Sequence, residues 1–142
     1  MKSWHWLLLV TLLIVNGAYG AEEEEAVEAA EEEIPSSAIY IPVKPAFVVN
    51  YGGPGKLKYM KLEISLRARD TNASNAIRHH MPLIRDYLVR QFSALEDEDV
   101  DTQRGKEAVR VAALEGIKAL IKEEDGEEGV VGLYFNNFVI QR

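Results

Sequence analysis

Residues 42–69 read PVKPAFVVNYGGPGKLKYMKLEISLRAR, two strand-like runs joined by the turn residues Gly52-Gly53-Pro54-Gly55. The second run alternates between apolar and polar residues along its whole length. Its apolar members are Met60, Leu62, Ile64, Leu66 and Ala68, and its polar members are Tyr59, Lys61, Glu63, Ser65, Arg67 and Arg69. A period of two is typical of a strand with one buried and one solvated face. Glycine and proline favour tight turns, so the pattern predicts a β-hairpin.

The first run, from Ile39 to Tyr51, is rich in β-branched and aromatic residues but contains Pro42 and Pro45. Proline cannot donate a hydrogen bond to a neighbouring strand, so it is confined to edge strands and bulges. We therefore expect the first half of this run to be an edge or a lead-in. Phe47 to Tyr51 is the better strand.

A helix is expected directly after the hairpin, because Asp70-Thr71 is a typical N-cap. Pro82 interrupts this helix, since proline is tolerated in the first turn of a helix but not in its interior. We place the break near His80 and a second segment from Pro82 to about Leu95. Apolar residues spaced three or four apart form one stripe over both segments. They are Ile77, Met81, Ile84, Leu88, Phe92 and Leu95.

The remainder of the chain predicts a loop, a long helix and a final strand. Residues 96–101 are acidic and are expected to form a loop. A helix from about 102 to 124 follows, with apolar residues at helical spacing. Gly116 lies inside it, and we interpret this glycine as a close approach to the sheet. A charged turn at 123–129 precedes a last strand from Val130 to Gln141.

The expected order is therefore β-β-α-α-β, within one domain from residue 38 to 142. This order favours an α+β fold of two layers, in which helices pack on one face of a small, mainly antiparallel sheet. A domain of this size buries enough surface to fold without covalent cross-links. The chain contains no cysteine, so it has no disulfide.

Residues 1–20 resemble a secretory signal peptide. Lys2 supplies the positive charge, Trp6 to Val15 form an apolar run, and small residues precede a cleavage site between Gly20 and Ala21. These three features in this order are typical of exported proteins. An alternative is that the segment stays uncleaved as a short anchor, although a membrane-spanning helix needs about 20 apolar residues.

Residues 21–37 are expected to be a disordered acidic linker. Glu22 to Glu33 contains eight glutamates, no basic residue and only Val27 as a large apolar side chain. Such a segment cannot bury an apolar face, and it extends by self-repulsion. An alternative is a tail that binds calcium or a stator protein. The net charge of −7 comes from this linker, because residues 34–142 contain fifteen acidic and fifteen basic side chains.

The sequence disfavours several kinds of chemistry. Without cysteine there is no thiolate metal site and no cysteine nucleophile, and no basic stripe is present to neutralise nucleic-acid phosphates. His79 and His80 are adjacent, so on a helix they point about 100° apart and are poorly placed to share a metal. The acidic loop lacks the glycine and the final glutamate of a calcium-binding loop, since Thr102 and Ala108 stand there. We expect no cofactor, no metal and no enzymatic activity.

Four stretches occur in an order and spacing typical of one protein family. They are Pro42 with Phe47-Val48-Val49-Asn50, then Tyr59 to Leu66, then Ile84-Arg85-Asp86, and the ending Leu133 to Gln141. Through them, from about Ile39 to Gln141, the chain resembles the flagellar basal-body-associated FliL family. No single stretch is chemically diagnostic, but their combination is fairly specific.

This resemblance implies a periplasmic, membrane-proximal domain similar to the stomatin/SPFH fold, without catalytic activity. It also implies association with the flagellar motor near its stator units, self-association into rings, and effects on motility, swarming and chemotactic rotation. The alternative function is a periplasmic scaffold or chaperone-like module of another envelope complex.

The contact residues that we expect are aromatic or edge-strand positions. They are Phe47, Asn50, Tyr134, Phe135 and Phe138. Because one face of the last strand packs inward, we expect only one of the alternate sets Leu133/Phe135 and Tyr134/Phe138 to be free.

Overall fold

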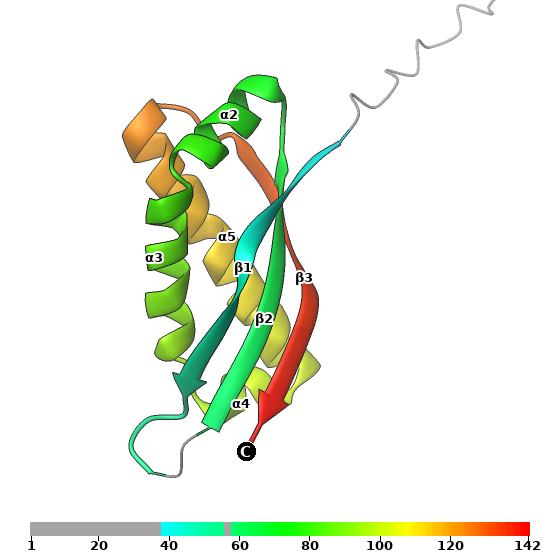
Figure 1. Ribbon diagram of the computed structural model, residues 1–142, viewed down its shortest axis with the longest axis vertical. Coiled ribbons are helices and arrows are strands. Elements are labelled where there is room, and N and C mark those ends of the chain that lie inside the picture. Colours follow the sequence, from blue (N-terminus) through cyan, green and yellow to red (C-terminus); the bar gives the residue numbers. More distant parts are fainter. Residues whose placement is uncertain (1–37, 56–57) are drawn as a thin grey trace, which may run out of the picture. The chain divides into compact units, whose positions relative to one another are not determined.

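The structure is a computed structural model that describes residues 38–55 and 58–142. Figure 1 shows three strands side by side, with the helices gathered on one side of them. The strands are β1 (Ile39–Tyr51), β2 (Lys58–Ala68) and β3 (Val130–Gln141), and the helices are α2 (Thr71–His79), α3 (Met81–Ser93), α4 (Asp97–Asp101) and α5 (Gln103–Asp125). The predicted signal peptide at 1–20, its cleavage site at Gly20 and Ala21, and the predicted linker at 21–37 lie outside the described residues.

The predicted α+β architecture is confirmed. The sheet has the order β1-β2-β3, and both strand pairs are antiparallel. Helix α3 packs along β1 and α5 along β3, so both long helices cover the same face of the sheet. The strand side chains on that face are buried, among them Leu62, Leu66 and Leu133. Among the described residues no helix covers the opposite side, which we call the open face.

Strand β1 lies at the edge of the sheet, as its prolines predict, but it is longer than expected. The whole run from Ile39 to Tyr51 pairs with β2, so the expected lead-in is part of the strand. Both prolines are accommodated because an edge strand has no second neighbour that requires their missing N–H groups. The pairing shifts register between Val43 and Phe47, and the Lys44–Pro45 peptide bond within the shift is cis.

The predicted break between the first two helices is confirmed at His80, which ends α2 and precedes α3. The apolar stripe is confirmed as well, because Ile77, Ile84, Leu88 and Phe92 are fully buried. One stripe can cross the break because its spacing continues from one helix into the next.

The acidic segment 96–101 forms a short helix, α4, where the sequence predicted a loop. The Glu96 side chain accepts a hydrogen bond from the backbone of Asp99, and the Asp99 side chain accepts one from the Glu96 N–H at 2.9 Å. This reciprocal capping satisfies backbone donors that a helix start leaves free. Val100 is fully buried and fixes the turn to the core.

Gly116 marks a close approach to helix α3, and not to the sheet as predicted. A Cβ at this position would overlap the hydroxyl oxygen of Tyr87. The Tyr87 ring therefore lies where a side chain of residue 116 would be, and its hydroxyl donates to the carbonyl oxygen of Ala112 at 3.5 Å. Burial raises the pKa of the Tyr87 phenol.

Gly116→Ala is expected to lower the free energy of unfolding by about 1–3 kcal/mol, the usual cost of overpacking. Urea denaturation measures this change. Tyr87→Ala removes the ring from the space that the new Cβ would occupy. In a Tyr87→Ala background, Gly116→Ala should therefore lower the free energy of unfolding much less. Equal costs in the two backgrounds would show that the two residues do not compete for space.

Asp70 caps α2, as predicted. Its Oδ1 accepts a hydrogen bond from the Ala73 N–H at 2.8 Å, and its Oδ2 accepts one from Arg69 Nε at 3.0 Å. The Ala73 hydrogen bond, and after it the Arg69 guanidinium, lower the pKa of Asp70 from its ordinary value of 3.8. A carboxyl with a lowered pKa stabilises the folded state above its unfolded pKa. That contribution is lost as the pH falls through the folded pKa.

Asp70→Asn is expected to reduce the loss of stability on acidification below about pH 4, because asparagine caps a helix without carrying a charge. The difference between the melting temperatures at pH 7 and pH 3 should therefore be smaller than in the parent chain. Asp70→Ala removes the cap as well and should lower the melting temperature at both pH values. If the melting temperature of Asp70→Asn falls between pH 7 and pH 3 by as much as that of the parent chain, this role of the carboxylate is contradicted.

A candidate interaction surface on the open face of the sheet

The open face is formed by alternate side chains of all three strands. Cross-strand pairing arranges them in rows that run from β1 across β2 to β3. The rows are Asn50–Tyr59–Gln141, Val48–Lys61–Val139, Pro42–Ser65–Tyr134 and Tyr40–Arg67–Gly132. Directly opposed side chains lie about 5 Å apart, so each row is a continuous strip of surface.

Large apolar and aromatic side chains are concentrated on this face. They are Val48 at 67% exposure, Tyr40 at 52%, Tyr59 and Val139 at 41% each, and Tyr134 at 38%. The helical layer contributes only Val89 and Val111 to the exposed large hydrophobic residues of the described chain. Exposed apolar residues that gather on one face are typical of a protein-binding surface.

Two tyrosines from the outer strands meet above the central strand. The ring centroids of Tyr40 and Tyr134 are 5.8 Å apart, with a tilted geometry that is favourable for aromatic pairs. Gly132 makes this possible, because a Cβ there would lie only 2.9 Å from the Tyr134 ring. The pair forms a preformed aromatic platform at one end of the open face.

The charged side chains of the open face are mostly basic. The face has three basic residues, Lys44, Lys61 and Arg67, and one acidic residue, Glu63. Lys61 Nζ lies 3.4 Å from Glu63 Oε1, with both side chains about half exposed. Within residues 38–55 and 58–142, neither Lys44 nor Arg67 has an ion-pair partner. The face therefore carries an excess of positive charge.

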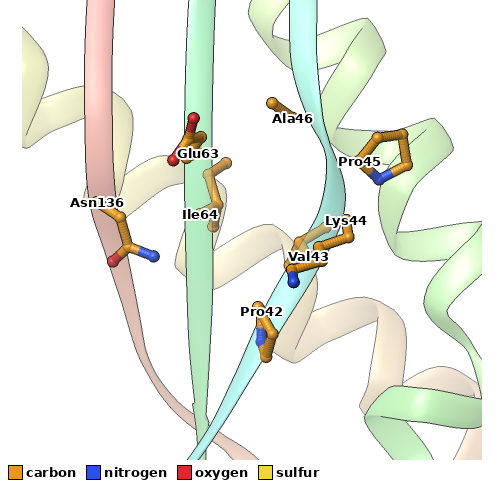
Figure 2. A pocket seen from close by; sticks show the side chains of 8 residues that line it. All are labelled: Pro42, Val43, Lys44, Pro45, Ala46, Glu63, Ile64 and Asn136. Carbon is orange, nitrogen blue, oxygen red and sulfur yellow. The ribbon is translucent and has the colours of Figure 1, made fainter.

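A hollow of about 310 Å³ lies where irregularities in both outer strands flank Glu63. On one side β1 loses register between Val43 and Phe47, and on the other β3 inserts Asn136 as a bulge. Figure 2 shows the hollow from the open face, with Asn136 and Glu63 across from the β1 segment that begins at Pro42. Bulges of this kind often re-aim side chains at binding sites.

The polar lining of the hollow is only partly occupied by internal contacts. Asn136 Nδ2 donates to Ser65 Oγ at 2.7 Å, which holds the bulge against the central strand. Lys44 and Glu63 line opposite walls without forming an ion pair with each other. The hollow thus offers one cationic, one anionic and one amide group to an incoming partner.

Both edges of the sheet are protected by helix side chains. On the β1 edge, Arg85 of α3 donates a hydrogen bond to the carbonyl oxygen of Pro45 at 2.6 Å. Its guanidinium carbon lies 4.4 Å from the centroid of the Phe47 ring, above the ring face. On the β3 edge, Arg110 of α5 donates to the carbonyl oxygen of Leu133 at 3.2 Å. Prolines and charges at an edge oppose the addition of a further strand. The geometry therefore favours contact through the face over contact through an edge.

The predicted contact residues divide between the two sides of the sheet. Asn50 and Tyr134 lie on the open face and are exposed. Phe47 is 1% exposed and belongs to the core, so it supports the fold and presents no surface. Phe135 and Phe138 pack against the core from β3, with ring centroids 5.2 Å apart.

The expectation that Leu133/Phe135 and Tyr134/Phe138 form alternate sets is wrong. Phe135 pairs with Ile64 and Phe138 with Leu62, so both point toward the helices. The bulge at Asn136 inserts one residue between them and reverses the alternation from there on.

Sequence reasoning missed Tyr40, Val48 and Val139. The signal for Val48 was present, because it alternates with the buried Phe47 and Val49 and therefore faces the other way. Val139 was concealed by the bulge in β3, which no pattern in the sequence reveals.

Elsewhere in the described chain, the histidine pair serves a local contact. His80 Nε2 lies 3.2 Å from Asp125 of α5, and its ring stands edge-on to His79. Among the described residues there is no group of three or more side chains placed to hold a metal ion. In the same part of the chain no helix is long and apolar enough to cross a membrane.

Comparison with known proteins gives two matches. The family model described as "Flagellar basal body-associated protein FliL" matches residues 40–141. A curated relative from Aquifex aeolicus (strain VF5), described as "Flagellar protein FliL", is 27% identical over 107 residues. The aligned region is 75% of this chain but only 64% of the relative, so the chain spans less than two thirds of the relative's length. The matched residues include nearly all of the sheet and both walls of the hollow.

Proposed function

Because the chain belongs to the FliL family of flagellar basal-body-associated proteins, we propose that it is a non-enzymatic accessory protein of the basal body. It binds the flagellar motor or its stator units by protein–protein contact and so affects motility, swarming and chemotactic rotation. The observation that carries the binding mode is the open face. Its tyrosines and valines are exposed and lie outside the core, and among the described residues its cations Lys44 and Arg67 have no ion-pair partner.

Tyr40, Val48, Tyr134 and Val139 supply the apolar contact area of the proposed interface. Aromatic residues contribute large contact areas at low entropic cost and are enriched at the energetic centres of interfaces. Asn50 extends the same surface toward the hairpin, and the hollow beside Glu63 receives a protruding side chain of the partner. Phe135 and Phe138 act indirectly, because they hold β3 in the register that exposes Tyr134 and Val139.

The location and assembly of the domain follow from the same proposal. Residues 38–142 form a periplasmic domain similar to the stomatin/SPFH fold, exported or held at the inner membrane by residues 1–20. The segment 21–37 links the two. Self-association into an oligomer or ring places several open faces around the motor.

Deleting the gene is expected to reduce swarming or motor speed under load while leaving flagella assembled. Swarm-plate diameter, electron microscopy of filaments and the rotation rate of tethered cells in viscous medium measure these effects. Wild-type behaviour in all three assays would contradict the proposal. Recovery of only non-flagellar envelope proteins with the purified chain would instead favour a scaffold of another complex.

A further inference from the structure

We propose that the hollow beside Glu63 binds the side chain of a tyrosine from the partner protein. This inference rests on the proposed function in one respect, which is that the open face contacts a partner. It adds the chemistry of the residue that enters the hollow. Three properties of the described residues carry it: the walls of the hollow, its two charges and its fixed shape.

The walls of the hollow favour an aromatic ring. Its volume of about 310 Å³ lies at the lower end of the range for pockets that enclose a small molecule. The β1 side is lined by apolar side chains, those of Pro42, Val43, Pro45 and Ala46. Aromatic residues contribute large apolar contact areas at interfaces, so a ring gains more from these walls than a short aliphatic side chain does.

Two opposite charges line the hollow without neutralising each other. Lys44 comes from β1 and Glu63 from β2. Within the described residues Glu63 pairs with Lys61, whereas Lys44 forms no ion pair. A cationic side chain in the hollow would be attracted by Glu63 and repelled by Lys44, and an anionic one would meet the reverse. Because the two effects oppose each other, the hollow favours a neutral side chain.

A phenol hydroxyl matches both charges at once. An ammonium only donates hydrogen bonds and a carboxylate only accepts them, whereas a phenol does both. The hydroxyl of a tyrosine can therefore donate to Glu63 and accept from Lys44, and hydrogen bonds to charged groups are the stronger kind. An indole only donates. A phenylalanine ring would remove both charged groups from water without a replacement hydrogen bond, which is costly. Tyrosine is thus the neutral aromatic residue that satisfies both groups.

The hollow is held in shape by hydrogen bonds of its own. On the β3 side, Asn136 Nδ2 donates to Ser65 Oγ at 2.7 Å. On the β1 side, Arg85 of α3 donates to the carbonyl oxygen of Pro45 at 2.6 Å. Figure 2 shows Asn136 on one side and Pro45 on the other, with Glu63 on the strand between them. A site that is ordered in advance loses less entropy when a ligand binds, so a single tyrosine side chain should bind measurably.

Nuclear magnetic resonance of the isotopically labelled full chain in mild detergent tests the proposal, with N-acetyl-tyrosinamide as the probe. The backbone amide signals of Lys44 and Ala46 and the side-chain amide signals of Asn136 should shift as the probe is added. A dissociation constant of about 0.3–3 mM is expected for a fragment of this size. N-acetyl-phenylalaninamide differs only in lacking the hydroxyl and should bind about tenfold more weakly.

Two variants separate recognition of the hydroxyl from contact with the ring. Lys44→Met removes the donor and Glu63→Gln removes the charge of the acceptor, so each should weaken binding of the tyrosine amide several-fold. Both should change binding of the phenylalanine amide little, because that probe makes neither hydrogen bond. Lys118→Met is the matched control, since Lys118 pairs with Glu115 on α5 and does not line the hollow. None of the three substituted residues is buried, so each variant should fold.

Four outcomes would overturn the proposal. They are a complete lack of shifts, shifts confined to residues outside the hollow, equal affinities for the tyrosine and phenylalanine amides, and tighter binding of N-acetyl-argininamide than of the tyrosine amide. None of them involves motility. Reduced swarming of a deletion strain would support the proposed function even if the hollow does not bind tyrosine, and normal swarming would contradict that function without altering the measured binding.

Discussion

A chain that carries Val48→Glu together with Val139→Glu is expected to remain folded but to lose its function in motility. Both residues flank Lys61 in one row of the open face. A glutamate beside a lysine on neighbouring strands is a favourable pair of roughly 0.2–1 kcal/mol, so folding should tolerate the change. Burying two carboxylates in an apolar interface is costly, and affinity for the motor partner should fall about 100-fold or more.

Complementation of a deletion strain measures this effect. The double variant should leave the swarm diameter at the level of the deletion, while its melting temperature stays close to that of the parent chain. Val89→Glu with Val111→Glu is the matched control, because these valines are 39% and 43% exposed on α3 and α5. Full complementation by the open-face variant would contradict a role of the open face in binding. Loss of complementation in the control variant alone would place the interface on the helical layer.

Phe92→Ala is expected to destabilise the domain by about 3–5 kcal/mol, the cost of removing a large aromatic side chain from a packed core. The Phe92 side chain is fully buried between the helices and the sheet. The centroid of its ring lies 5.6 Å from that of Phe47 in β1 and 6.3 Å from that of Phe135 in β3. One side chain therefore packs against both outer strands. Most small domains have a total stability of about 5–15 kcal/mol, so the variant should be at least partly unfolded near its working temperature.

Thermal unfolding followed by circular dichroism measures this loss. Val89→Ala lies one helical turn away on the exposed side of α3 and should change stability by less than about 0.5 kcal/mol. A Phe92→Ala chain that melts within a few degrees of the parent would contradict the central position of this side chain.

The hairpin and the first helices could be predicted because their signals are local. The alternation of Met60 to Ala68 sets one face of β2, and the same residues are buried in the structure. Asp70 caps α2 where the sequence places the cap, and the break at His80 follows from Pro82. Each of these features depends on residues within one turn or one strand.

One error arises where the structure depends on residues far apart in the chain, and another where a segment is too short to show a period. Gly116 faces Tyr87 because two helices approach each other, and a single helix pattern contains no information about its neighbour. The short helix α4 depends on reciprocal hydrogen bonds of Glu96 and Asp99, in a segment too short to show a helical period.

The candidate site was predictable only in part for the same reason. Of the expected contact residues, Tyr134 and Asn50 lie on the open face. The bulge at Asn136 reverses the alternation in β3, so Phe138 turns inward and Val139 outward, against the sequence pattern. Even the open face becomes apparent only when all three strands are aligned.

The most direct test is photo-cross-linking in living cells with a benzophenone amino acid at Val48. Val111 on α5 serves as the control position, because it is an exposed valine in the helical layer, at 43% exposure against 67% for Val48. The account predicts covalent adducts with a flagellar motor or stator protein from Val48 and none from Val111. Motor adducts from Val111 and not from Val48, or Val48 adducts that contain only proteins unrelated to the flagellum, would contradict it.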